Sequence, residues 1–167
     1  MARVALVTGG MSGLGEAVCI KLVALGYQVV TTYTHGNTRA AAWQASMKEL
    51  GYDFSAYPCD IADYHLALAC VTQVQKEVGP IDVLVNNAGI TRDMTFKKMD
   101  KTNWDAVMRT NLDSVFNMTK PVCDANLVCR RIGKFCCRSE DWHRAWDSTI
   151  LLQRCHQLSP EIPTYYC

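Results

Sequence analysis

Residues 8–15 read TGGMSGLG, and this stretch decides the fold because of the segments on either side of it. A short apolar run from Val4 to Val7 precedes it, and a helical pattern from Gly13 to Leu25 follows it. The unpaired N–H groups and the positive dipole end of a helix attract phosphate groups. A strand, a glycine-rich turn and a helix in this order therefore predict a pyrophosphate-binding site.

Each glycine of the turn has an expected task. Gly9 permits a tight turn, Gly13 lets the backbone approach a phosphate, and Gly15 lets the helix pack close to the strand. Ser12 and Leu14 lie between these glycines and are expected to contact the cofactor with them. The alternative is an ordinary glycine-rich turn, but the flanking strand and helix favour phosphate binding.

The pattern outside the turn predicts the fold class. Strands are expected at the apolar runs 4–7 and 81–85, at the β-branched segment 28–33 and, more weakly, at 54–57. They alternate with helices expected at 13–25, 40–50, 62–78 and 102–120. Strands that are apolar throughout are typical of parallel sheets covered on both faces. Repeated strand, helix and strand units imply right-handed crossovers. We therefore expect an α/β fold with a Rossmann-like, doubly wound parallel sheet, incomplete at its C-terminal side.

Composition narrows the possible partners. The 167 residues suffice for one domain, and the net charge of +1 with mixed signs does not favour nucleic acid. No run approaches the ~20 apolar residues of a membrane span, and no secretion signal is present, so a cytoplasmic protein is expected. The nine cysteines contain no CxxC pair, so neither a zinc site nor a disulfide framework is expected.

The end of the second expected strand indicates which nicotinamide cofactor binds. An acidic residue there would bond the ribose hydroxyls and repel a 2′-phosphate. Residues 30–34 contain no carboxylate, and Arg39 follows at the start of the next helix. Because a guanidinium holds a phosphate by two parallel hydrogen bonds, we expect NADP rather than NAD. The alternative is that Arg39 is a solvated surface charge.

Polar residues also follow the third and fourth expected strands. Asn86 and Asn87 come directly after the buried run 81–85, at the sheet edge where ligands of this architecture bind. The alternative is a plain turn. Asp60 closes the third strand at the same edge. It could accept a bond from an adenine amino group, or it could cap the following helix.

Asn111 is the most informative single residue. The helix expected at 102–120 begins with a segment resembling a capping box at Thr102, and its apolar face is expected to contain Trp104, Val107, Met108, Leu112 and Val115. Asn111 falls on that face. Since a buried amide costs free energy unless it is bonded, a role in a proton relay or in holding water would explain it. A satisfied structural asparagine is the alternative.

Together these residues resemble the short-chain dehydrogenase/reductase superfamily. The shared motifs are the TGxxxGxG turn, Asp60, the segment 86–89 and Asn111, within about the first 124 residues. Within the superfamily, segments 89–99 and 102–117 and Trp43 look most like the acetoacetyl-CoA reductases of polyhydroxyalkanoate synthesis. The 3-oxoacyl-(acyl carrier protein) reductases of fatty acid synthesis share segment 90–93 and are the alternative.

The resemblance implies NADPH-dependent reduction of acetoacetyl-CoA to (R)-3-hydroxybutyryl-CoA, an acyl-CoA thioester as substrate, and a homotetramer for the intact enzyme. It implies that Asn111 is catalytic, that Asp93 lies near the substrate, and that Asp60 and Ile61 bind the cofactor. It also places five residues on the nicotinamide side of the cofactor, namely Asn87, Ala88, Gly89, Ile90 and Thr91.

The chain departs from this family in its last third. Family members carry a serine on the fifth strand and a Tyr-x-x-x-Lys pair that neutralises the charge developing on the substrate oxygen. None of the seven tyrosines has a lysine four residues later. The composition also changes near Asp124, and only a helix at 142–154 is suggested beyond it. We therefore expect a partial reductase domain at 1–124, an out-of-frame or poorly ordered tail at 125–167, and no turnover.

Overall fold

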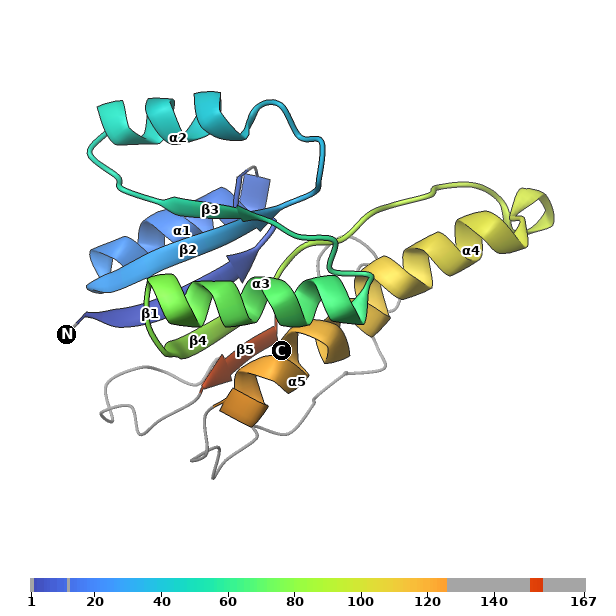
Figure 1. Cartoon of the computed structure of the whole chain (residues 1–167). Coiled ribbons are helices and arrows are strands. Elements are labelled where there is room, and N and C mark those ends of the chain that lie inside the picture. Colours follow the sequence, from blue (N-terminus) through green and yellow to red (C-terminus); the bar gives the residue numbers. More distant parts are fainter. Residues whose placement is uncertain (1, 12, 126–150, 155–167) are drawn as a thin grey trace.

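A computed structural model describes residues 2–11, 13–125 and, for the backbone, 151–154. The sheet order is β3-β2-β1-β4-β5, with β1 at Arg3–Thr8, β2 at Tyr27–Tyr33, β3 at Ser55–Pro58, β4 at Ile81–Asn86 and β5 at Leu151–Arg154. The first four strands are parallel, and α1 (Gly13–Ala24), α2 (Ala40–Glu49) and α3 (Tyr64–Glu77) connect them (Figure 1). The expected Rossmann-like sheet, incomplete on one side, is confirmed.

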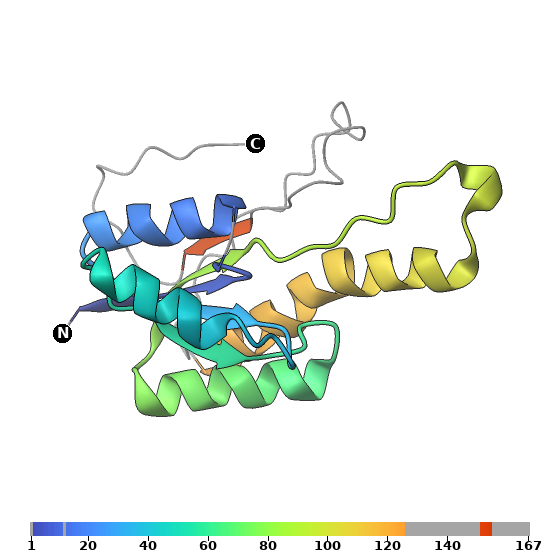
Figure 2. The ribbon, with the colours of Figure 1, turned by 90° about the horizontal axis from the view of Figure 1, so that it is seen from above.

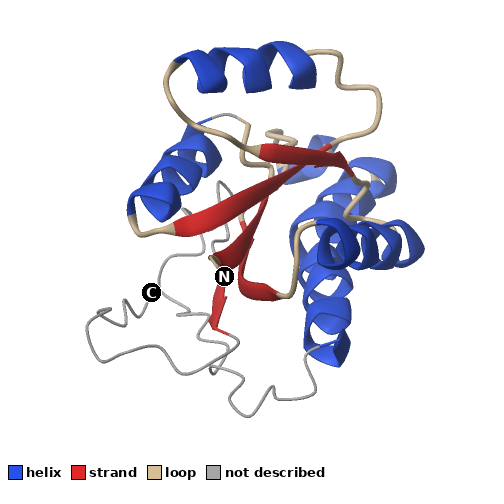
Figure 3. Cartoon of the chain, turned by 60° about the vertical axis from the view of Figure 1, so that its left-hand side comes forward, coloured by secondary structure: helices blue, strands red, loops and turns tan. Residues whose placement is uncertain are grey.

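Alternate residues of β1 are buried on the two faces of the sheet. Val4 and Leu6 of β1 pack with α3 and α5 (Ser114–Ala125), whereas Ala5 and Val7 pack with α1 and α2. Figure 3 shows these helices on opposite sides of the sheet. Since β1 is covered on both faces and flanked by β2 and β4, its residues Val4 to Val7 are all apolar and buried, as the sequence pattern predicts.

The strand β5 differs from the sequence-based expectation. It pairs antiparallel with β4, with Val83 opposite Arg154 and Asn86 opposite Leu151. The helix expected up to residue 154 is therefore wrong for residues 151–154. The backbone groups along the outer edge of β4 accept a partner strand of either direction, and this pairing cannot be read from local periodicity.

The helix expected at 102–120 begins and proceeds differently. It starts as α4 (Lys101–Met108), and its N-cap is Asp100, whose carboxylate accepts a hydrogen bond from the Asn103 N–H at 2.7 Å. The expected start at Thr102 is therefore wrong. A π-helical turn, η2 (Arg109–Asp113), then joins α4 to α5. Such turns are frequent at functional sites.

The N-cap of α3 is Asp63, not Asp60. The Asp63 carboxylate accepts hydrogen bonds from the N–H groups of His65 and Leu66, at 2.8 and 3.0 Å. The Asp60 carboxylate instead bonds the Ala62 N–H at 3.0 Å, which closes a small turn before the helix. The capping alternative for Asp60 is therefore wrong, because the chain makes this extra turn before α3 begins.

The Asp63 cap makes stability depend on pH. The N–H groups of Leu66 and His65 hold the pKa of the Asp63 carboxyl below its usual value. The cap therefore stabilises the fold above the usual aspartate pKa of about 4, and this contribution is lost as the pH falls through the lowered pKa. We expect Asp63→Asn, which caps without titrating, to flatten the fall in Tm between about pH 5 and pH 3. Thermal melts at several pH values test this, and equal slopes for both proteins would contradict it.

None of the helices among the described residues has the length and apolar character needed to cross a membrane.

Candidate functional site

The Thr8 side chain joins the carboxyl ends of β1 and β4. Its hydroxyl is buried and accepts hydrogen bonds from the N–H groups of Asn87 and Ala88, both at 3.0 Å, while it donates to the Val85 carbonyl at 3.4 Å. The Asn87 amide returns the contact by donating to the Thr8 and Gly9 carbonyls, at 2.9 and 3.2 Å. The glycine-rich turn and the residues after β4 therefore form one rigid unit.

This unit leaves no room for side chains at two glycines. Gly9 has a φ of +65°, and a Cβ there would lie 2.9 Å from the Ala88 Cβ. A Cβ on Gly15 would lie 2.5 Å from both the Gly9 carbonyl oxygen and the Asn87 Nδ2. The first turn of α1 thus packs directly on the loop after β1, which is the close approach that the sequence predicts for Gly15.

The open side of the turn faces solvent. Gly13 begins α1 with a φ of +54°, and a Cβ there would meet nothing within 4 Å. The Leu14 side chain is 48% exposed. The backbone at Gly13, the first residue of the twelve-residue helix α1, is therefore accessible to a ligand, as a phosphate site requires. Ser12 lies outside the described residues.

Two residues that sequence analysis missed hold Gly10. The Thr31 hydroxyl accepts a hydrogen bond from the Gly10 N–H at 2.7 Å and donates to the Val7 carbonyl at 3.0 Å. The Cys19 thiol donates to the Gly10 carbonyl at 3.7 Å. Burial, together with the charge of Glu16, raises the pKa of Cys19 to about 12, so the thiol keeps its proton. The sequence offers one sign of this role, because Thr31 is a polar residue that follows two valines in the strand β2.

Arg39 lies where the sequence places it, at the N-cap of α2. Its backbone N–H donates to the Asn37 side-chain oxygen at 3.0 Å, and its side chain is exposed. Within residues 2–11 and 13–125, ion pairs join Lys101 to Asp105 and Lys120 to Asp124, and neither includes Arg39.

The segment after β3 is held from α5. The Ile61 carbonyl accepts a hydrogen bond from the Asn117 side-chain amide at 2.9 Å, and both residues are buried. Asp60 precedes Ile61 and is exposed at the carboxyl end of β3. Asn117 is not among the residues predicted from the sequence, although its polar side chain among the apolar positions of the 102–120 helix could have identified it.

Asn111 binds the segment after β4. Its side-chain oxygen accepts a hydrogen bond from the Ile90 N–H at 2.8 Å, and its amide donates to the Ile90 carbonyl at 2.9 Å. A Cβ on Gly89 would lie 3.3 Å from that oxygen. The side chain is thus bonded as the structural alternative requires, and it lies in the π-helical turn beside the predicted nicotinamide side. Its catalytic role stays a prediction.

The apolar face expected for this helix is only partly buried. Val107 and Val115 are buried, whereas Trp104 is 37% and Leu112 is 57% exposed. Trp104 is exposed because α4 extends away from the sheet and covers no strand (Figure 2). Leu112 lies in the π-helical turn that leads from α4 to α5.

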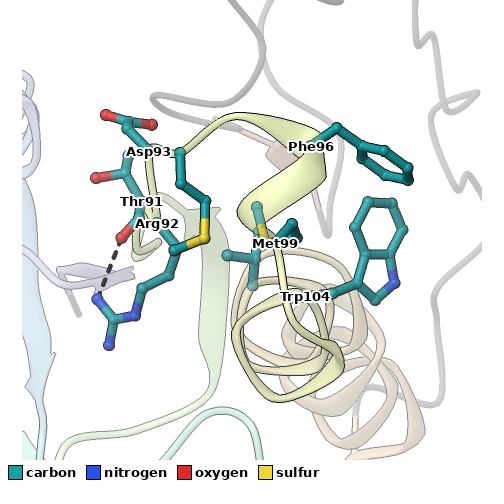
Figure 4. A pocket seen from close by; sticks show the side chains of 8 residues that line it. Thr91, Arg92, Asp93, Phe96, Met99 and Trp104 are labelled. Atoms are coloured by element: carbon teal, nitrogen blue, oxygen red, sulfur yellow. Dashed lines mark hydrogen bonds between the residues drawn. The ribbon is translucent and has the colours of Figure 1, made fainter.

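A pocket lies in the segment between β4 and α4. It has a volume of about 310 Å³ and is lined by Thr91, Arg92, Asp93, Met94, Phe96, Met99, Trp104 and Val107. Figure 4 shows Asp93 and Thr91 on one side and the rings of Phe96 and Trp104 on the other. Phe96 opens the 3₁₀ turn η1 (Phe96–Lys98) and is 83% exposed. The predicted substrate residue Asp93 therefore borders an apolar pocket beyond the carboxyl end of β4.

The described residues contain no group of three or more histidine, cysteine, aspartate or glutamate side chains that could hold a metal ion. The polar groups of the site come instead from backbone amides, hydroxyls and side-chain amides at the ends of β1 and β4.

Two curated proteins are examples of sequences that are similar to this chain. The chain is 47% identical over 122 residues to an acetoacetyl-CoA reductase of Cupriavidus necator, covering 73% of this chain and 50% of that protein. It is 39% identical over 117 residues to the 3-oxoacyl-[acyl-carrier-protein] reductase FabG of Staphylococcus aureus, covering 70% and 48%. The chain thus spans about half the length of these relatives.

A solved structure shows the same arrangement. The gluconate 5-dehydrogenase of Burkholderia cenocepacia, crystallised with NADP and tartrate, matches with a TM-score of 0.67 and 31% identity, over 74% of this chain and 48% of that one. The family model described as "short chain dehydrogenase" matches residues 3–134. On this match and the shared geometry, the chain belongs to the short chain dehydrogenase family.

Proposed function

We propose that the chain is the NADPH-binding half of a reductase that converts acetoacetyl-CoA to (R)-3-hydroxybutyryl-CoA. The observation that carries this proposal is the rigid unit of the glycine-rich turn and the Asn87-Ala88 backbone, held together by Thr8. The 47% identity to an acetoacetyl-CoA reductase supports the substrate. The similarity to an acyl-carrier-protein reductase supports the alternative carrier, at a lower identity of 39%.

The residues present fit a dinucleotide along the carboxyl edge of the sheet. Gly9 and Gly15 let the turn pack closely against its own protein neighbours, whereas Gly13 leaves open space at the start of α1, where the N–H groups would bind the diphosphate. Asp60 and Ile61 would contact the adenine side, and segment 87–91 the nicotinamide side. Arg39 would bind the 2′-phosphate, since neither ion pair within residues 2–11 and 13–125 includes its guanidinium.

The chemistry divides between cofactor and protein. When bound, NADPH supplies a hydride to the substrate carbonyl. Asn111 fixes the backbone at Ile90 through two hydrogen bonds, so it keeps the nicotinamide side in one conformation. Asp93 and the pocket next to it would receive the acyl group. The chain has no Tyr-x-x-x-Lys pair to donate a proton to the developing alkoxide, so we expect binding without turnover.

A titration of the purified chain with NADPH and NADH tests the cofactor. We expect NADPH to bind more tightly, and Arg39→Ala to weaken NADPH about ten- to hundredfold because a charge-assisted contact is lost, with NADH little changed. Lys48→Ala, a charge loss at the other end of α2, is the control and should change neither affinity. Unaltered NADPH preference in Arg39→Ala would refute the assignment.

A turnover assay on the same samples separates the possible functions. NADPH binding without reduction of acetoacetyl-CoA supports the binding-half proposal for this chain, and reduction by the chain would overturn it. A complete homologous chain, given acetoacetyl-CoA and an acetoacetyl thioester of acyl carrier protein, distinguishes the two carriers. The homotetramer and the cytoplasmic location implied for the intact enzyme belong to the same proposal.

The origin of residues 125–167 is a further part of the proposal. The missing Tyr-x-x-x-Lys pair and the change in composition near Asp124 support a shifted reading frame. Reading the other two frames of the coding DNA tests this. A Ser and Tyr-x-x-x-Lys pattern in one of them supports the shift, and its absence from both refutes it.

A further inference from the structure

The indole of Trp43 joins the starts of two helices. Its Nε1–H donates a hydrogen bond of 2.7 Å to the Glu16 carboxylate, although Trp43 lies 27 positions after Glu16 in the chain. Glu16 directly follows Gly15 in the first turn of α1, and Trp43 lies in the first turn of α2. The bond therefore connects the helix that would hold the diphosphate to the helix that carries Arg39.

The orientation of this indole is fixed from its other side. The Trp43 ring stacks on Phe54 with centroids 5.3 Å apart and planes at 15°, and Phe54 in turn stacks on Tyr52 at 5.7 Å. Phe54 is 5% exposed and belongs to the core formed with α1 and α2. Since the ring cannot turn without leaving this stack, its N–H is held in the direction of Glu16.

Arg39 lies one helical turn before Trp43. The Trp43 backbone N–H donates to the Arg39 carbonyl at 2.9 Å, so the two residues share one face of the first turn of α2. On the outer side, the Asn37 side chain accepts the Arg39 N–H. A shift of Trp43 therefore carries the Arg39 backbone with it.

The same bond engages the Glu16 carboxylate. Glu16 is the acidic residue nearest in sequence to the glycine-rich turn. In the structure the carboxylate bonds the neutral indole, and neither ion pair of residues 2–11 and 13–125 includes Arg39. The guanidinium stays available for a phosphate.

We propose that the Glu16–Trp43 hydrogen bond positions Arg39 and thereby sets the preference for NADPH over NADH. Glu16 and Trp43 are positioning residues in this account, because they act through Arg39 and not through contact with the cofactor. The inference rests on the proposed function, in which Arg39 binds the 2′-phosphate.

The test uses the complete 167-residue chain and the ratio of the NADH and NADPH dissociation constants. Trp43→Phe retains a stacking ring and removes the N–H, and Glu16→Ala removes the acceptor. We expect each to lower the ratio about three- to tenfold through weaker NADPH binding, as loss of one hydrogen bond implies. The double variant should be no worse than either single one, because both remove the same bond.

Two matched variants separate the bond from other effects. Glu16→Gln retains an acceptor oxygen without the charge and should keep the ratio of the wild type. Glu49→Ala, a carboxylate truncation at the end of α2, should leave it unchanged. Thermal melts identify any variant with impaired folding. If Trp43→Phe fails to fold, Glu16→Ala and Glu16→Gln alone decide the proposal.

The outcomes separate the inference from the proposed function. Equal weakening of NADPH and NADH in Trp43→Phe and Glu16→Ala would show a packing role and overturn the inference. Arg39→Ala, measured beside them, reports on the proposed function. If it lowers the ratio while the other two variants do not, the inference alone fails; if it leaves the ratio unchanged, or if neither nucleotide binds the wild-type chain, both fail.

Discussion

Replacing Thr8 by valine is expected to lower the free energy of unfolding by about 3 kcal/mol, because two N–H donors in a partly buried joint lose their acceptor. The Asn87 and Ala88 N–H groups both bond the Thr8 hydroxyl, and valine offers the same volume without an oxygen. Urea denaturation followed by circular dichroism measures the loss. NADPH binding should weaken with it, since the joint sets the position of the glycine-rich turn.

Thr8→Ser is the matched control for this change. Serine retains the hydroxyl and removes one buried methyl group, so a loss of about 1 kcal/mol is expected. A serine variant as unstable as the valine variant would show that packing, and not the hydroxyl, holds β1 to the segment after β4. Equal stability of the valine variant and the wild type would contradict the hydrogen-bonded joint itself.

The second large effect is expected for Gly15→Ala, which should weaken NADPH binding about hundredfold. The new Cβ would lie 2.5 Å from the Gly9 carbonyl oxygen, which is backbone and cannot rotate away. The start of α1 must then move from the turn, and two charge-assisted bonds to the diphosphate are lost at about 1.5 kcal/mol each. Calorimetric titration with NADPH measures the change.

Gly26→Ala provides the comparison at the other end of α1. Gly26 has a φ of +81° and open space around its Cβ position, so alanine there costs about 1 kcal/mol of backbone strain without a clash. Its NADPH affinity should equal that of the wild type. The packing explanation fails if Gly15→Ala retains NADPH affinity, or if Gly26→Ala loses as much.

The local pattern predicted most of the fold correctly. The four parallel strands and the helices between them follow from apolar runs and glycine stops, because strand and helix periods are properties of neighbouring residues. The sequence left capping of α3 as one of two alternatives for Asp60, and the structure gives the cap to Asp63 because the chain makes an extra turn between the two aspartates. The antiparallel β5 depends on a partner about seventy residues away.

The sequence indicates candidate site residues but not the hydrogen bonds that connect them. The glycines and Asn87 stand in motifs, so their types and spacing indicate a ligand. Thr31 and Asn117 stand in no such motif, and their hydrogen bonds to Gly10 and Ile61 join residues 21 and 56 positions apart. Bonds of that kind arise from the packing of whole elements, which a single sequence does not display.

The antiparallel direction of β5 affects any attempt to extend the sheet with a separate polypeptide. Residues 151–154 use the outer edge of β4 from Val83 to Asn86. A separate polypeptide whose strand extends the parallel sheet would compete for the same donors and acceptors. Adding such a strand is then a strand exchange, in which residues 151–154 must leave β4 before the new strand can pair.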